Sequence, residues 1–156
     1  MPKRPACVII AAMLSIAGCS VFVSPPQHVE SGPEVVCFLH NGSAFKKAVV
    51  EQVTVELAVD GYTVITGDPK RAKYYDAADY GAVVYMADYW MWHVPFHQKA
   101  YYAKNGEPAN VVFVITSGDP DVTVTKPFDA ITSASKDDRI EPVAALIIAR
   151  LGKILP

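Results

Sequence analysis

Residues 110–116 read Asn-Val-Val-Phe-Val-Ile-Thr, and they are the strongest indication of fold class in the chain. Five consecutive apolar side chains, β-branched or aromatic, favour a strand because such side chains pack well on a pleated sheet. A strand with one solvated face would alternate apolar and polar residues, whereas an unbroken apolar run suits a strand buried on both faces of a parallel sheet. The run therefore predicts an α/β fold with helices on both sides of the sheet.

Strand and helix patterns alternate along the rest of the chain. Further strands are predicted at residues 34–39, 62–66, 81–86 and 128–132, and helices at residues 43–60, 96–104 and 135–153. Strands that alternate with helices indicate an open parallel sheet with right-handed crossovers. We therefore expect a single five-stranded parallel sheet with flanking helices. The segment 70–80 is open to two interpretations, a short helix or a loop.

The first and last predicted helices carry clear periodic patterns. In the first, apolar residues recur every four positions, at Phe45, Val49, Val53 and Leu57. Ser43 is placed to cap the start of this helix and Gly61 to end it. The last is expected to begin at Ser135, in a capping-box pattern with aspartate in place of glutamate. Its predicted buried stripe is Val143, Leu146, Ile147, Leu151 and Ile154.

The N-terminus has the form of an export signal. Lys3 and Arg4 precede a short apolar run over residues 6–17, a pattern typical of a secretory signal peptide. The run is shorter than the roughly 20 apolar residues that a transmembrane helix needs. The ending Ile16-Ala17-Gly18-Cys19 resembles the lipobox of bacterial lipoproteins, in which the cysteine thiol is acylated and becomes the new N-terminus.

This resemblance implies a membrane anchor and a location. Residues 1–18 would be the signal peptide, residues 19–33 the lipidated Cys19 with a proline-rich tether, and residues 34–156 one folded domain. The residue after the cysteine is Ser20 rather than aspartate. In this it resembles bacterial lipoproteins that are sorted to the outer membrane rather than retained at the inner one. We expect a periplasm-facing protein of the bacterial cell envelope, held at the membrane through Cys19.

Charge and cysteine content narrow the function classes. The 156-residue chain has a formal net charge of −2, and without Lys3 and Arg4 its 14 basic residues fall to 12 against 16 acidic ones, a net charge of −4. This balance indicates no nucleic-acid partner; a protein partner stays open. After removal of the signal and acylation of Cys19, Cys37 is the remaining thiol. Its apolar neighbours favour a buried, inert side chain over a reactive one.

Three segments together resemble the flavodoxin-like family. Residues 79–95 resemble the family's third strand and its aromatic loop, and residues 96–118 resemble the helix and the fourth strand that ends in Thr-Ser-Gly. Residues 129–135, Asp-Ala-Ile-Thr-Ser-Ala-Ser, resemble the ending of some small members. The resemblance implies a flavodoxin-like fold with its ligand site beyond the carboxyl ends of the strands, at residues 40–45, 87–95 and 117–127.

The same resemblance implies a flavin phosphate loop at residues 39–44. Flavin-binding members have Ser/Thr-x-Thr-Gly-Asn-Thr there, and its hydroxyl and backbone N–H groups hold the phosphate at a helix N-terminus. This chain has Leu-His-Asn-Gly-Ser-Ala, without the threonines. The phosphate-binding candidates are therefore Asn41, Gly42 and Ser43, and Lys46 and Lys47 could attract an anion.

Aromatic residues follow the predicted third strand. Tyr89, Trp90 and Trp92 could stack on an isoalloxazine ring, or they could belong to the core or to a partner surface, where aromatic residues are also enriched. The family's Gly-Thr-Pro is replaced by residues 86–88, Met-Ala-Asp, and an aspartate beside a flavin would disfavour the anionic reduced form. The candidate flavin site is therefore partly degraded.

No catalytic or metal-binding constellation stands out. His93 and His97 are four residues apart, but Pro95 between them breaks a continuous helix, so no metal site is expected. Two functions follow as hypotheses. The favoured one is a lipid-anchored, non-catalytic binding or scaffold module without a cofactor. The alternative is an FMN-dependent electron carrier or quinone reductase tethered to the membrane, with catalytic residues unknown.

Overall fold

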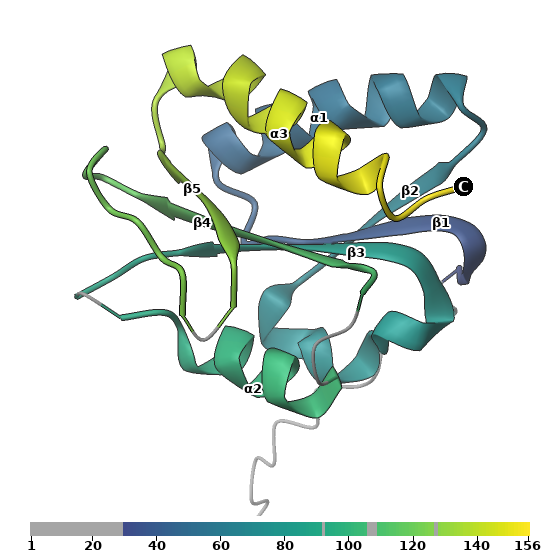
Figure 1. Ribbon diagram of the computed structural model, residues 1–156, viewed down its shortest axis with the longest axis horizontal. Helices are drawn as coiled ribbons and strands as arrows, with labels where there is room; N and C mark the ends of the chain where they lie inside the picture. The colour runs from purple at the N-terminus through teal and green to yellow at the C-terminus, as the bar shows by residue number, and fades with distance from the viewer. Residues whose placement is uncertain (1–29, 92, 106–108, 127) are drawn as a thin grey trace, which may run out of the picture.

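Five parallel strands form the centre of the domain (Figure 1). The computed structural model describes residues 30–91, 93–105, 109–126 and 128–156. The strands are β1 (Gly32–Leu39), β2 (Thr63–Gly67), β3 (Tyr80–Asp88), β4 (Val111–Ser117) and β5 (Ala130–Ala134), in the order β2-β1-β3-β4-β5. Every neighbouring pair is parallel. The predicted open, parallel, five-stranded sheet is confirmed, and its order reverses between β1 and β3.

Helices cover both faces of the sheet. The helices α1 (Ala44–Val59) and α3 (Ile140–Leu151) lie on one face, and α2 (Phe96–Asn105) lies on the other (Figure 1). The segment 70–80, for which the sequence allows a short helix or a loop, lies mostly in two short 3-10 helices. These are η1 (Pro69–Tyr74) and η2 (Ala77–Asp79), on the same face as α2. No helix within the described ranges is long and apolar enough to span a membrane.

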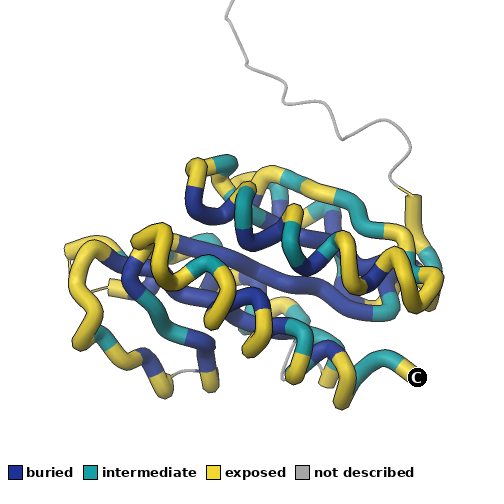
Figure 2. The backbone as a smooth tube through the Cα atoms, turned by 90° about the horizontal axis from the view of Figure 1, so that it is seen from above, coloured by how far each residue is buried: buried dark blue, intermediate teal, exposed yellow. Residues whose placement is uncertain are grey.

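Burial on both faces explains the apolar run that begins at Val111. In β4, Val112 and Val114 pack toward α1 and α3, whereas Phe113 and Ile115 pack toward α2. The central strands β1, β3 and β4 form the dark, buried layer in the middle of Figure 2, whereas the edge strand β2 is half-exposed. Since both faces are dry, neither needs polar side chains, and the pattern is continuous rather than alternating.

The first helix agrees with its predicted pattern. The side chain of Ser43 accepts a hydrogen bond from the backbone N–H of Lys46, as an N-cap should. All four apolar positions spaced four residues apart are buried: Phe45, Val49, Val53 and Leu57. Gly61 follows the helix at a φ of +85°, where a side chain would be strained.

The C-terminal region differs from its prediction in two ways. No helix begins at Ser135, because its backbone N–H still bonds to the carbonyl of Ser117 and continues the β4–β5 hydrogen bonding. The 3-10 turn η3 (Asp137–Arg139) comes next, and α3 starts only at Ile140. Leu146, predicted to be buried, is 51% exposed, and Ala144 takes its place in the packed stripe.

The last strand starts two residues later than predicted. Phe128 is buried, but it lies before β5 and stacks on Phe113, with 4.0 Å between the ring centroids. Its aromatic side chain therefore packs in the core between the sheet and α2. Phenylalanine is common in strands, but here it does not pair with a neighbouring strand. The free thiol of Cys37 is fully buried as predicted, and burial raises its pKa to about 12.

Candidate functional site

The carboxyl ends of β1 and β3 form the point where the strand order reverses, which in open α/β sheets is the usual place for a ligand. Asn41 follows β1, and Asp88 is the last residue of β3. Asn41 Nδ2 donates a hydrogen bond to Asp88 Oδ2 at 2.5 Å. The crevice is therefore bridged by side chains of the chain itself.

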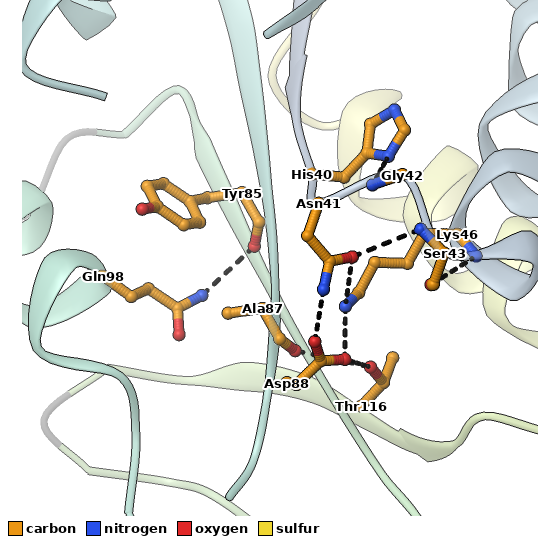
Figure 3. A network of polar contacts seen from close by, with 10 residues as sticks. All are labelled: His40, Asn41, Gly42, Ser43, Lys46, Tyr85, Ala87, Asp88, Gln98 and Thr116. Atoms are coloured by element: carbon orange, nitrogen blue, oxygen red, sulfur yellow. Dashed lines mark hydrogen bonds and ion pairs between the residues drawn. The ribbon is translucent and has the colours of Figure 1, made fainter. Parts of the chain in front are cut away.

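Lys46 lies beneath this bridge and is fully buried. Its Nζ makes an ion pair with Asp88 Oδ1 and donates a hydrogen bond to Asn41 Oδ1 at 3.2 Å (Figure 3). Thr116, at the end of β4, donates its hydroxyl to Asp88 Oδ1 at 3.1 Å. A buried charge needs such partners, because its desolvation is costly otherwise. The four residues Asn41, Lys46, Asp88 and Thr116 are called the switch-point network below.

Three backbone donors at the β1–α1 junction are also taken. The N–H of Gly42 bonds to His40 Nδ1 at 3.0 Å, and the N–H of Ser43 points to Asn41 Oδ1 at 3.4 Å. The N–H of Lys46 bonds to Ser43 Oγ. A phosphate at this helix N-terminus would have to displace these side chains, and the buried cation of Lys46 is already neutralised by Asp88. The loop therefore fits the phosphate of FMN poorly.

The hydrogen bonding of this loop depends on the protonation state of His40. Burial, with help from the nearby charges of Lys46 and Lys47, lowers the pKa of His40 below its usual 6.5. Burial also lowers the pKa of His97. The neutral form of His40 is the one that accepts the hydrogen bond from Gly42, because a protonated imidazole has no free acceptor nitrogen.

The folded state should therefore lose stability in acid. Groups with a depressed pKa contribute stability above the unfolded pKa, near 6.5, and lose it as the pH falls through the folded value. We expect the free energy of unfolding to decline between pH 7 and pH 5, and to decline less in His40→Asn, which keeps an acceptor but does not titrate. Urea unfolding at several pH values measures both slopes. Identical slopes for the two proteins would contradict the role given to His40.

A large cavity lies beside the network, on the face of the sheet that α2 covers. It has a volume of about 830 Å³ and mostly apolar walls, formed by the loop after β3, the start of α2 and the start of η1. Asn41, Asp88 and Trp90 line it. Gly42 lines a separate depression beside Thr66 and Lys70, and Ser43 lines neither space. Loop 117–127, expected to form part of the site, lies at other, smaller depressions in its described part.

The predicted aromatic platform is divided. Trp90 lines the large cavity and is 75% exposed. Tyr89 is half-buried and lines the small depressions next to residues 117–126. Trp92 lies outside the described residues. The structure thus brings Asn41 and Trp90 to one cavity and places Tyr89 at another, and the part these residues play in holding FMN stays a prediction.

Two buried side chains that the sequence patterns did not single out help to shape this region. Gln98 of α2 is fully buried and donates its amide to the carbonyl of Tyr85 at 3.2 Å, which ties α2 to β3 (Figure 3). The hydroxyl of Tyr85 in turn donates to the carbonyl of Pro69 at 2.9 Å. These bonds hold η1 and α2 against β3 on the same face of the sheet, where their ends form the cavity walls.

His93 and His97 both line the cavity, but they belong to different elements. His93 is in the loop, where it pairs with Trp90 through two backbone hydrogen bonds of 3.0 and 3.4 Å, and His97 is in α2. Within the described ranges, no group of three or more histidine, cysteine, aspartate or glutamate side chains is placed to hold a metal ion.

Met91 occupies a strained position in the same turn. Its φ is +49°, in the left-handed region that side chains other than glycine and asparagine rarely adopt. This conformation costs about 1–2 kcal/mol for a residue with a Cβ. Because its side chain is exposed and lines the cavity, methionine at this position cannot be explained by core packing.

Met91→Gly should therefore stabilise the fold. The strain relieved exceeds the extra chain entropy of glycine, which is about 0.5–1 kcal/mol, so a net gain of about 0.5–1 kcal/mol is expected. Chemical denaturation measures the gain. The matched control is Thr123→Gly, at an exposed loop position with negative φ, which should show no gain. A Met91→Gly protein no more stable than the parent would argue against backbone strain.

Comparison with known proteins bears on the fold alone. No family model matches the chain, and no curated protein matches it. Among solved structures, the crystal structure of oxidised Flavodoxin 2 from Bacillus cereus superposes with a TM-score of 0.51 and 13% sequence identity, covering 76% of this chain and 98% of the flavodoxin. The chain therefore has a flavodoxin-like α/β fold, as its sequence predicts.

Proposed function

We propose that this protein is an exported, lipid-anchored protein of the bacterial cell envelope whose flavodoxin-like domain is a non-catalytic binding module without FMN. The observation that carries the proposal is the switch-point network. Its lysine is buried and paired with Asp88, and the N–H groups of Gly42, Ser43 and Lys46 are bonded to nearby side chains. A phosphate there would have to displace these hydrogen bonds, and the buried cation is already paired.

Cofactor binding is tested with the purified mature domain. We expect no visible flavin absorption in protein taken directly from cells, and none retained after incubation with excess FMN and gel filtration. The rival is the FMN-dependent electron carrier or quinone reductase, with Trp90 against the ring. Under that hypothesis the preparation would be yellow and Trp90→Ala would lose the colour without unfolding, since the side chain of Trp90 is largely exposed. A stoichiometric flavin spectrum would overturn the proposal.

The anchor is supported by the sequence of residues 1–33, of which residues 1–29 lie outside the described part. Single acyl chains hold proteins only marginally, so stable attachment implies more than one chain on Cys19. The short tether would keep the domain near the membrane, and Ser20 favours the outer membrane over the inner. The anchored domain would face the periplasm.

Cys19→Ala should abolish acylation and processing. Cells that express the full chain are labelled with a palmitate analogue, and membrane and soluble fractions are compared by gel mobility. We expect the parent to be labelled and shortened, and Cys19→Ala to be unlabelled and either precursor-length or released. Cys7→Ala, in the signal peptide, is the matched control and should behave as the parent. Unchanged labelling of Cys19→Ala would remove the lipobox assignment.

A further inference from the structure

The large cavity beside the switch-point network has the dimensions of a ligand site. Its volume of about 830 Å³ lies within the range of pockets that enclose small molecules, which are typically apolar with a few polar groups at fixed positions. Met86 and Val94 are buried side chains in its wall, and Pro95 is half-buried. An apolar body would therefore be taken out of water on entering it.

Large apolar side chains are exposed around the same cavity. Trp90, Met91 and Phe96 have 75%, 65% and 84% of their surface exposed, and all three line the cavity. Single exposed apolar residues are common, but a cluster around one hollow marks a binding surface. The strained backbone of Met91 points the same way, because strain persists where a function uses it.

The charges around the cavity favour an anion. Lys70 of η1 and Lys99 of α2 line it from different elements, and neither has an ion-pair partner among the described residues. The acid in the wall, Asp88, is neutralised by Lys46 and hydrogen-bonded by Asn41 and Thr116. Asp68 lies near His97 and offsets part of the positive charge around the cavity, but it does not line the cavity.

We propose that this cavity binds a monomeric amphipathic carboxylate, an alkyl chain or aryl body with one anionic head. The apolar part would lie against Met86, Val94 and Phe96, and the carboxylate would lie at Lys99 or Lys70. This assignment rests on the proposed function, since it names the ligand class of the binding module. A phospholipid head group has a similar anionic character, and the test separates the two sources.

The test uses the full mature chain without its acyl groups, with decanoate as the probe. Trp90 lines the cavity, and the other tryptophan of the sequence, Trp92, is two positions further on, so intrinsic fluorescence follows changes at Trp90. We expect saturable binding of decanoate below its micellar concentration, weaker binding of decanol, and the weakest binding of decyltrimethylammonium. Calorimetry gives the stoichiometry, which should be one.

Two variants test the contacts. Lys70→Gln/Lys99→Gln should weaken decanoate binding by about threefold to tenfold, the effect of losing partly exposed ion pairs, and should leave decanol binding unchanged. Phe96→Ala, at a largely exposed position, should weaken both. Lys153→Gln, exposed beyond the end of α3, is the control and should change neither.

Several outcomes would overturn the inference. They are no saturable binding of decanoate, equal affinity for the cationic and anionic probes, an unchanged affinity in the double lysine variant, and binding to phosphatidylglycerol vesicles but not to monomeric decanoate. FMN is titrated into the same samples. If decanoate and FMN both fail to bind, the ligand class is wrong while the flavin-free module stands; if FMN binds, the proposed function fails independently.

Discussion

Replacement of Asp88 by asparagine is expected to lower the free energy of unfolding by about 3 kcal/mol, because it leaves a buried lysine without its counter-charge. Lys46 has no exposed surface, whereas the Asp88 side chain is 49% exposed. Asparagine keeps the size of the side chain and can still accept a hydrogen bond, so the loss reports on charge. The exposure of Asp88 places the estimate at the lower end of the range for buried pairs.

Replacement of the lysine partner should lower the free energy of unfolding much less. Lys46→Met removes the buried cation, and the half-exposed carboxylate of Asp88 can then be hydrated, so we expect a loss of about 1 kcal/mol, equivalent to one hydrogen bond. Lys46→Met/Asp88→Asn should recover most of the loss caused by Asp88→Asn, since no buried charge is left unpaired. Urea unfolding of the four proteins completes the double-mutant cycle.

Two controls separate the pair from general effects of charge. Lys47→Met removes the neighbouring lysine, which is exposed, and Asp121→Asn removes an exposed acid that has no ion pair within the described residues. Both should change the free energy of unfolding by less than about 0.5 kcal/mol. If Asp88→Asn resembles Asp121→Asn, the buried ion pair contributes little to stability, and Lys46 could exchange Asp88 for a phosphate at this loop at little cost.

The fold could be predicted because its strongest signals are local. The apolar run of β4 and the four-residue repeat from Phe45 to Leu57 each define an element without reference to the rest of the chain. The ends of helices and strands are harder to predict from the sequence where a tertiary contact decides them. Ser135 has the composition of a helix cap, but its N–H is held by the carbonyl of Ser117, a partner 18 positions earlier in the sequence.

The site could be predicted only in part, since its main interaction joins distant residues. Lys46 was expected to attract an anion and Asp88 to repel a reduced flavin, and each inference considered one charge alone. The structure pairs them across 42 positions, because the parallel register of β1 and β3 brings the loop after Leu39 beside the end of β3. Tyr89 and Trp90, adjacent in sequence, likewise line different spaces.

Gly81 shows how tightly these two strands approach at their other end. A Cβ at this position would lie 2.0 Å from the carbonyl oxygen of Pro33 and 3.0 Å from its carbonyl carbon. The register between β1 and β3 also shifts here, between Gly32 and Val36. Because the obstacle is backbone rather than a flexible side chain, relief requires movement of the start of β1.

Gly81→Ala is therefore expected to destabilise the domain by about 3 kcal/mol, near the upper end for overpacking, because the added Cβ meets backbone. The matched control is Gly118→Ala, where an added Cβ would meet nothing within 4 Å. There alanine should be neutral or stabilising by up to about 1 kcal/mol, because it restricts the unfolded chain. Thermal and urea unfolding of both variants measure the difference. Equal stability of the two would mean that β1 can move away from β3 at little cost, and that the close contact at Pro33 does not constrain the sheet.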